Sequence, residues 1–536
     1  MELSSPSYCC FICGLPLPFK KTNNATQLQS SLPPIQFRVD HIKRCGKEFG
    51  VKISDFNIPD DSSPSPPPNP NPQPTSTSTS KTTSNKKSIN DVLMAPPKPP
   101  PKRNLNSVLL AGAALAKSAP KKNTSGNPKR YKKSIWSTTA SHNNIPTPPK
   151  YKILPQTSIL IDGFKYVHPN TSSTYFLTHF HFDHYGGITS NWSAGTIYCS
   201  SITSKLLQQQ LNVDAKYIQE LPMNEAYTII SKDCKGMDVT VTLTDANHCP
   251  GAVIFFFTLK KPTRPKAIKR ILHVGDFRWN TPLFLKNSLY IKIKTKPVGW
   301  LNELFLDTTY CDEKYCFPEQ GEAVKATIEC VENEDIKNLS TLFLFGAYTI
   351  GKEKVFLEVA KKFKKKIYVD SQRYKILSTF IKSDEFEKIF TRNQNETNMW
   401  VVSLGNIVNK GMKEILESAN KSKKTLSNPY YRVVGFRPSG WSFNPPKKNT
   451  SNKKQTLLNP IKRSIPDIVS HRVSGSISIY GIPYSEHSSF SELVDCLLCL
   501  RPVKITPTVG AGRSEEQVDL LLTACRVEAE RRMYEE

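Results

Sequence analysis

The sequence lacks the features that mark secreted and membrane proteins. Its 13 cysteines among 536 residues are scattered, without the dense spacing of a disulfide-linked extracellular scaffold. We see no charged and then apolar leader at its start, and so expect a reducing compartment. The longest uncharged apolar run, Ala252 to Leu259, is far shorter than the roughly 20 residues that cross a bilayer. These absences predict a soluble protein with no membrane partner.

Acidic residues are also few relative to basic ones. The chain has 46 Asp and Glu against 73 Lys and Arg, which gives a formal net charge of +27. Between Lys81 and Lys150 alone, fourteen Lys or Arg stand against one acid, Asp91, for a net +13. Such an excess favours a polyanionic partner, with nucleic acid the leading candidate, although simple solubility is the ordinary alternative.

Histidine is rare as well, with ten in the chain, yet His179, His181 and His184 fall within six positions together with Asp183. They directly follow the apolar run Tyr175 to Leu177. A strand that ends there lets the alternate residues His179 and His181 project together. The turn that follows would carry Asp183 and His184 to a second, adjacent point. We therefore expect two neighbouring metal sites rather than a polar loop with solvated histidines.

Three other polar residues of the chain each follow an apolar run. Asp162 follows Ser158 to Ile161, His248 follows an alternating strand, and Asp276 follows Ile271 to Val274. Any one of them alone is more often a turn residue or a cap. Together they predict strand ends that bring His and Asp to one rim of a sheet, as in a hydrolytic site with two metals.

The chain divides into segments of different composition. We expect a zinc finger over residues 9–47, a disordered basic Pro- and Ser-rich linker over 48–150, and a folded body from 151 onward. The basic run 128–133 suits a nuclear import signal or a non-specific arm on phosphates, and we favour import. A strand, a basic helix and a strand over 341–369 predict an inserted α/β subdomain at 317–470, with a disordered loop at about 444–463. The main domain would then comprise 151–316 and 471–536.

The finger prediction rests on four residues with soft ligand atoms, namely Cys10, Cys13, His41 and Cys45. A Cys pair across a tight turn and a His and Cys on one helical face can hold a tetrahedral zinc ion. This pattern resembles the C-C-H-C ubiquitin-binding finger found ahead of several DNA-repair enzymes. The resemblance implies ubiquitin or a ubiquitinated repair factor as a partner.

The folded body resembles a known enzyme family. The successive strand-end motifs, including Gly-Asp-Phe-Arg at 275–278, look like those of the metallo-β-lactamase fold. The later motifs resemble its β-CASP branch, and within that branch the DNA cross-link repair nucleases to which Artemis and Apollo belong. These motifs lie at 306–311, 348–354, 435–441 and 483–490. The resemblance implies an α/β fold, an αββα sandwich with a β-CASP insertion.

The family also implies roles for individual residues. The first metal would be held by His179, His181, His248 and Asp276, and the second by Asp183, His184 and the shared Asp276. Asp162 would fix ligand imidazoles from behind. Asp307 and His487 match the first two β-CASP motifs and would lie over the metals, where His487 contacts the phosphate or protonates the leaving oxygen. Val509 stands at the third motif, where DNA-cleaving members have Val and RNA-cleaving members have His.

A pocket for a 5′-phosphate is a further expectation. Ser485, Ser488 and Ser489 precede an expected helix, whose free N–H groups bind anions, but ordinary helix capping explains them equally well. Lys352, Arg432 and Arg437 are further candidates for phosphate contacts, or else solvated surface charges.

The resulting hypothesis is a nuclear, zinc-dependent phosphodiesterase, a 5′-to-3′ DNA exonuclease acting in interstrand cross-link repair. It would hold one tight zinc ion, a weaker second metal and a structural zinc in the finger. The alternatives are a structure-specific endonuclease that opens hairpins or cuts flaps, an RNA-processing nuclease, a small-molecule hydrolase, and a non-catalytic repair scaffold.

Overall fold

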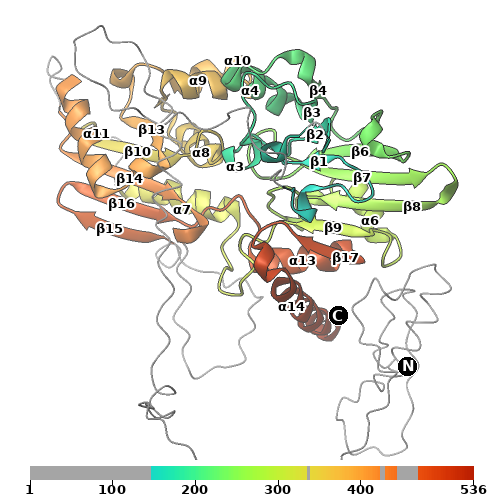
Figure 1. Ribbon diagram of the computed structural model, residues 1–536. Helices are drawn as coiled ribbons and strands as arrows, with labels where there is room; N and C mark the ends of the chain where they lie inside the picture. The colour runs from blue at the N-terminus through green and yellow to red at the C-terminus, as the bar shows by residue number, and fades with distance from the viewer. Residues whose placement is uncertain (1–146, 169, 335–337, 423–428, 443–468, 536) are drawn as a thin grey trace, which may run out of the picture. The chain divides into compact units, whose positions relative to one another are not determined.

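The computed structural model describes residues 147–168, 170–334, 338–422, 429–442 and 469–535 (Figure 1). The predicted finger residues Cys10, Cys13, His41 and Cys45 lie outside the described residues, as do the predicted linker up to residue 146 and the predicted loop at 444–463. In the part of the chain that is described, no helix combines the length and apolarity needed to span a bilayer.

Two sheets form the first layered unit. The four-stranded sheet is parallel and has the order β1-β2-β3-β4, and the six-stranded sheet is mixed, with the order β17-β9-β8-β7-β6-β5. The strands of the first are β1 (Leu160–Ile161), β2 (Thr174–Phe176), β3 (Thr196–Cys199) and β4 (Ile218–Glu220). Those of the second are β5 (Ala226–Ile229), β6 (Asp238–Asp245), β7 (Val253–Lys261), β8 (Arg264–His273), β9 (Glu303–Leu306) and β17 (Lys504–Pro507).

Alternating apolar residues fill the space between these two sheets. Along β6, Val239, Val241 and Leu243 are fully buried, as the period-two pattern of a strand requires. Phe176 of β2 packs edge-on against both Phe255 and Phe257 of β7, with ring centroids 5.1 Å apart in each case. The two sheets therefore share one aromatic-rich core.

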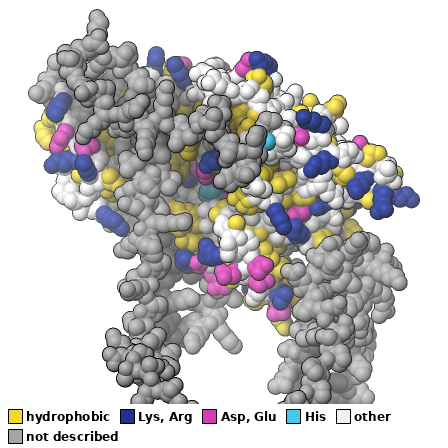
Figure 2. All heavy atoms as spheres, in the orientation of Figure 1, with side chains coloured by type: hydrophobic (Ala, Val, Ile, Leu, Met, Phe, Trp, Pro, Cys, Tyr) yellow, Lys and Arg dark blue, Asp and Glu magenta, His cyan; other side chains and the backbone are white. Residues whose placement is uncertain are grey.

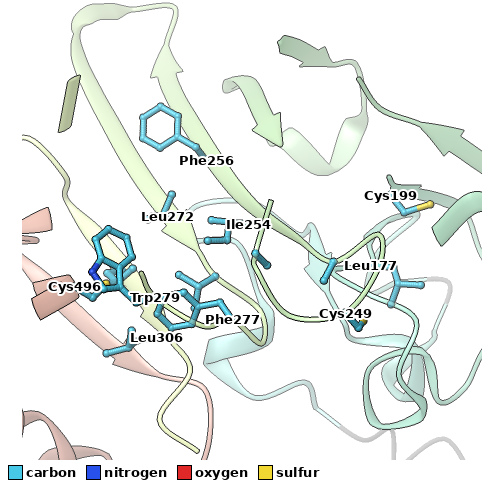
Figure 3. Close-up of a cluster of buried hydrophobic side chains, with 14 of the residues drawn as sticks. Leu177, Cys199, Cys249, Ile254, Phe256, Leu272, Phe277, Trp279, Leu306 and Cys496 are labelled. Atoms are coloured by element: carbon cyan, nitrogen blue, oxygen red, sulfur yellow. The ribbon is translucent and has the colours of Figure 1, made fainter. Parts of the chain in front are cut away.

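Helices cover the outer faces of both sheets. Helix α4 (Ser201–Leu211) packs Leu206 and Leu207 on the four-stranded sheet. The six-stranded sheet is covered by α6 (Ser288–Thr295), α13 (Phe490–Leu500) and α14 (Ser514–Glu535), with the short α5 (Thr281–Phe284) beside them. Figure 3 shows part of this outer core, where Leu272 and Leu306 of the sheet lie near Trp279 and near Cys496 of α13. This αββα arrangement confirms the predicted fold class.

The second unit is a seven-stranded sheet of order β12-β11-β13-β10-β14-β16-β15, parallel except for β15. Its strands are β10 (Thr341–Ala347), β11 (Ile367–Tyr368), β12 (Phe390–Thr391), β13 (Met399–Ser403), β14 (Arg432–Pro438), β15 (Ser470–Ser474) and β16 (Ile477–Ile482). One face packs on α7 (Gln320–Asn333), α8 (Glu353–Phe363), α9 (Ser371–Leu377) and α10 (Ser383–Ile389), and the other on α11 (Asn409–Ser422).

The predicted strand–helix–strand unit corresponds to β10, α8 and β11, with β13 lying between the two strands. Strand β16 pairs with β14 through Ile482, so the seven-stranded sheet extends past residue 470, where we expected the main domain to resume. The chain then returns to the first unit through the loop 483–489 and enters α13. That return loop carries His487, which places it at the junction of the two units.

Candidate metal centre

The segment after β2 carries the predicted metal ligands, first the histidines of an extended stretch and then the residues of a short helix. The strand ends at Phe176, the chain bends at Phe180, and His181 has an extended backbone (φ −104°, ψ 147°). The short helix α3 (Phe182–Tyr185) follows and carries Asp183 and His184. Gly187 then passes so close to the backbone of Phe164 that a Cβ would lie 2.3 Å from its carbonyl oxygen, with φ +116°. Glycine is required at that turn.

Four residues from three parts of the chain form the first donor group. His179, His181, His248 and Asp276 each offer one ligand atom, and these atoms all lie within 4.8 Å of one another. His181 Nδ1 lies 2.9 Å from His179 Nε2 and 3.2 Å from His248 Nε2. Asp276 Oδ2 lies 3.8 and 3.9 Å from His179 Nε2 and His248 Nε2. Ligand atoms about 2 Å from a tetrahedral ion stand roughly 3.3 Å apart, so these spacings suit a metal.

Asp276 is shared with a second donor group. Its Oδ2 lies 3.3 Å from His184 Nε2, which in turn lies 3.8 Å from Asp183 Oδ2. The Asp183 side chain is 79% exposed, whereas that of Asp276 is 11% exposed. The second group is thus the more open of the two. The structure brings together all six residues that the sequence marked as metal ligands.

The outer nitrogens of the histidine rings are held by acceptors. His181 Nε2 lies 3.0 Å from the Ile350 carbonyl, His248 Nδ1 lies 2.7 Å from the Glu486 carbonyl, and His184 Nδ1 lies 2.8 Å from Asp162 Oδ2. Because carbonyl and carboxylate oxygens only accept, these nitrogens carry the protons. The inner nitrogens of His181 and His248, 3.2 Å apart, therefore present lone pairs to each other, which is the arrangement that a bound cation stabilises.

The pKa shifts differ among the histidines of the centre, because His179 and His248 are kept neutral whereas His184 is kept charged. Burial and the neighbouring imidazoles lower the pKa of His179, and they lower the pKa of His248 to about 3. Burial opposes charge on His184 too, but Asp276 and Asp162 outweigh it and hold its pKa well above its ordinary value. The same two carboxylates would favour a metal ion at that ring.

Asp162 lies behind the donor groups, not among them. Its carboxylate accepts hydrogen bonds from the Thr178 N–H at 2.9 Å and the Thr178 hydroxyl at 2.8 Å, and it also contacts His184. Burial would raise the pKa of Asp162, but His184, Lys152 and the Thr178 N–H together lower it. The carboxylate is therefore charged and fixes both the strand end and one imidazole.

Asp307 and His487 form a pair beside the donor groups. His487 Nδ1 lies 2.7 Å from Asp307 Oδ2, and His487 Nε2 lies 4.0 Å from Asp276 Oδ2. Burial disfavours the charged imidazole, yet Asp307 raises the pKa of His487 to about 8. The ring is thus protonated at neutral pH and points its second N–H towards the centre.

The serines proposed for phosphate binding have their hydroxyls in local hydrogen bonds. Ser485 Oγ accepts from the His487 N–H and donates to its carbonyl, and Ser488 Oγ accepts from the Trp279 N–H. Ser489 caps α13 in a capping box with Glu492. All three residues are buried. The Ser488 hydroxyl holds the return loop against the first unit, whereas those of Ser485 and Ser489 stabilise the loop itself and the start of α13.

The cationic candidates differ in exposure. Lys352 is buried, and its Nζ lies 2.9 Å from Glu486 Oε2. Arg432 pairs with Glu334 and donates to the Ser478 hydroxyl. Arg437 is half-buried, and its Nε has no hydrogen-bond partner among the described residues. Val509 is partly exposed, and its carbonyl accepts from the Thr308 hydroxyl at 2.8 Å, next to Asp307.

Sequence reasoning missed the Ile350 carbonyl and the whole of Glu486, which hold two ligand rings. Main-chain acceptors leave no mark in a sequence. The contact pairs are 169 and 238 residues apart along the chain. Both carbonyls lie in motifs that the sequence marked, 348–354 and 483–490, but nothing in those motifs assigns a role to a main-chain atom.

The sandwich of two sheets with a His and Asp cluster at its rim defines a hydrolase of the metallo-β-lactamase fold. Residues 384–513 match the family model described as DNA repair metallo-beta-lactamase. The chain is 36% identical over 405 residues to the DNA cross-link repair protein SNM1 of Arabidopsis thaliana, which covers 74% of this chain and 73% of that protein.

Two other relatives are similar. The DNA cross-link repair 1A protein of Homo sapiens is 35% identical over 366 residues, 68% of this chain and 31% of that protein. The 5′ exonuclease Apollo of Danio rerio is 29% identical over 363 residues, 67% of this chain and 52% of that protein. This chain belongs to the DNA cross-link repair nucleases, a β-CASP branch of the metallo-β-lactamase fold. The resemblance read from the motifs is confirmed, and with it a metal-dependent hydrolytic nuclease of DNA repair.

Proposed function

We propose that this protein is a zinc-dependent nuclease that degrades DNA strands from the 5′ end around interstrand cross-links. The observation that carries the proposal is the convergence of His179, His181, His248 and Asp276 beside the Asp307–His487 pair. The direction of attack is supported by the similarity to a relative named as a 5′ exonuclease.

Zinc is supported by the chemistry of the donors. Three imidazole nitrogens and one carboxylate oxygen suit zinc better than magnesium, which prefers oxygen ligands. We assign the first metal to His179, His181, His248 and Asp276, and the second to Asp183, His184 and Asp276. When bound, such ions acidify water and neutralise charge on a phosphodiester.

His487 would donate the proton that the leaving sugar oxygen needs. Its Nδ1 is held by Asp307, so its Nε2–H faces the space beside Asp276. Asp307 is itself fixed by hydrogen bonds from the Thr309 N–H at 3.0 Å and the Thr309 hydroxyl at 2.6 Å. The pair thus combines a charged imidazole with a fixed orientation, as general acid catalysis requires.

DNA rather than RNA is supported by Val509, since a valine side chain cannot complete the coordination of the second metal. The division into a main domain, expected at 151–316 with 471–536, and an insertion, expected at 317–470, remains part of the proposal, with the second limit of the insertion moved to Ile482, where β16 ends. A 5′-phosphate contact is also proposed. Of its candidates Ser485, Ser488, Lys352 and Arg437, we assign it to Arg437, whose Nε has no hydrogen-bond partner among the described residues. We further propose a zinc finger at Cys10, Cys13, His41 and Cys45 that binds ubiquitin, and a nuclear location.

The decisive experiment uses matched strands that carry a 5′-phosphate or a 5′-hydroxyl and a label at the 3′ end. We expect stepwise release of mononucleotides from the phosphorylated DNA, loss of activity with chelator, and recovery with zinc. Cuts at an internal hairpin or flap junction would instead favour the structure-specific endonuclease. Retention of DNA without any cleavage at restored zinc would favour the scaffold.

A further inference from the structure

One residue, Glu486, contacts both the first donor group and the turn that follows β10. Its main-chain carbonyl accepts the Nδ1–H of His248 at 2.7 Å. Its carboxylate accepts the main-chain N–H of Lys352 at 2.6 Å and pairs with Lys352 Nζ at 2.9 Å. Lys352 lies at the start of α8, in the turn that follows β10. Glu486 thus connects His248 to an element of the seven-stranded unit.

The turn from Tyr348 to Lys352 holds the other ring, since the Ile350 carbonyl accepts the Nε2–H of His181 at 3.0 Å. Two residues of this turn have positive φ, +104° at Gly351 and +73° at Lys352, and only for the lysine does this carry a steric cost. A Cβ on Gly351 would lie 2.9 Å from Glu486 Oε2. A left-handed lysine persists only where its surroundings hold it, so the pair with Glu486 explains the shape of the turn.

The ion pair is sealed from water. The side chains of Lys352 and Glu486 are 6% and 4% exposed, and Lys352 Nζ lies 5.5 Å from the ring centroids of both Tyr348 and Tyr484. Removal of one partner from such a pair leaves an uncompensated buried charge. Arg373 also supports the turn, by donating to the Tyr348 carbonyl at 2.6 Å.

We propose that the Lys352–Glu486 pair positions two ligands of the first metal. It holds the Ile350 carbonyl on His181 and the Glu486 carbonyl on His248, so that both rings present an unprotonated nitrogen to the ion. Lys352 is then a positioning residue and not a phosphate contact. This inference rests on the proposed function, because it takes His181 and His248 as metal ligands. The affinity for zinc then depends on the contact between the turn after β10, which belongs to the seven-stranded unit, and the return loop that carries Glu486.

The test measures zinc affinity by competition with a chromophoric chelator, independently of nuclease activity. All proteins are full-length and carry Cys10→Ser and Cys13→Ser, so that only the active centre reports. We compare Lys352→Gln, Glu486→Gln and the double variant with a matched control, Lys361→Gln, which breaks an exposed pair with Glu385 on the neighbouring helix α10. We expect each single variant to bind zinc about ten- to a hundredfold more weakly. The double variant should be no worse than the weaker single, and the control unchanged.

Circular dichroism and thermal unfolding verify that each variant is folded. Glu486→Gln keeps the size of the side chain and an acceptor for the Lys352 N–H, so it carries the test if Lys352→Gln does not fold. Folded variants that bind zinc as the parent does, but need more 5′-phosphorylated DNA for half-maximal rate, would overturn the inference and return Lys352 to phosphate binding. A parent protein that binds no zinc at the centre would instead overturn the proposed function.

Discussion

Asp276 is the residue on which the candidate centre depends, because it belongs to both donor groups and its carboxylate also lies within 4.8 Å of the ligand atoms of Asp307 and His487. Asp276→Ala should remove both metals and lower cleavage by about a thousandfold or more, since bound metals supply several kcal/mol of transition-state stabilisation. Asp183→Ala should remove only the second metal, since Asp183 belongs to the second group alone. The metal content of each purified variant, measured by mass spectrometry beside a single-turnover assay, checks both expectations.

The exposed position of Asp183 makes it a clean comparison, because its truncation leaves the buried first group intact. Both variants should retain DNA and unfold at temperatures near that of the parent without added metal. If Asp183→Ala lost both metals to the same extent as Asp276→Ala, the division into two donor groups would be wrong.

Residues that contribute side-chain atoms to the centre can be predicted from the sequence, whereas residues that contribute main-chain atoms cannot. His179, His181, Asp183 and His184 are side-chain donors in one short segment, so their spacing alone indicates the chemistry. The carbonyls of Ile350 and Glu486 are main-chain atoms that any residue could supply. Their contacts with His181 and His248 arise only when distant segments fold together. A resemblance to a family can indicate the ligands, but it does not reveal such contacts.

At the scale of elements, Ser489 at the N-terminus of α13 can be tested for two roles, which are stabilising the helix and binding the substrate phosphate. Ser489 Oγ accepts from the Glu492 N–H at 3.3 Å, and Glu492 accepts a hydrogen bond from the Ser489 N–H at 2.7 Å. Ser489→Ala should therefore lower the free energy of unfolding by about 1 kcal/mol. Urea denaturation measures this loss, with Ser371→Ala, which changes an exposed serine at the start of α9, as the control.

The preference for a 5′-phosphate should be unchanged in Ser489→Ala, because the hydroxyl is buried and already bonded. A variant of normal stability that no longer distinguishes phosphorylated from hydroxyl ends would show that the helix N-terminus binds the substrate anion.

A second element depends on one carboxylate. Asp233, in the short 3-10 helix at Lys232–Cys234, accepts through Oδ2 from the Ser173 N–H, the Ser173 hydroxyl and the Thr174 hydroxyl, each at 2.8 Å. Burial would raise the pKa of Asp233, but these bonds hold it below its ordinary value. The stabilisation is therefore complete above the ordinary pKa of an aspartate and is lost as pH falls through the lower, folded value.

Asp233→Asn should lower the free energy of unfolding at pH 7 by about 1–3 kcal/mol, because hydrogen bonds to a charged acceptor are removed. Its decrease in stability between pH 7 and pH 3 should be smaller than that of the parent. Thermal unfolding across this range measures both effects, and Asp238→Asn, an exposed carboxylate on β6, serves as the control. Equal acid sensitivity of the parent and Asp233→Asn would contradict the assignment.

Sequence periodicity predicts the presence and type of a helix or strand better than it predicts the residues at which that element begins and ends. The alternation over Val239 to Thr244 predicts a buried strand, and β6 follows it with one further residue at each end. The amphipathic basic pattern predicts a helix from Lys352 to Lys364, but α8 begins one residue later, because Lys352 is left-handed and pairs with Glu486. Helix propensity favours lysine inside a helix, and only the tertiary ion pair reveals why it stands outside.

At the scale of the whole molecule, positive charge is spread over both the described part of the chain and the segment before it. Figure 2 shows a group of Lys and Arg side chains at the right edge of the visible face, where β7 joins β8. Exposed residues there include Lys260, Lys261, Arg264 and Lys266. DNA binding should therefore have two electrostatic contributions that can be separated by deletion.

Deletion of residues 81–146 removes thirteen Lys or Arg and one Asp, and it spares every residue of the candidate centre. The affinity for a long duplex should fall at low salt, and the plot of log affinity against log salt should become shallower by about 0.9 for each phosphate that the protein no longer neutralises. The two curves should converge at high salt, where counterion release contributes little. The turnover of a short, 5′-phosphorylated strand at saturation should not change.

Deletion of the uncharged residues 62–80 is the matched control for shortening. An unchanged slope after deletion of 81–146 would assign the phosphate contacts to the folded part alone, with the β7–β8 group the first to mutate.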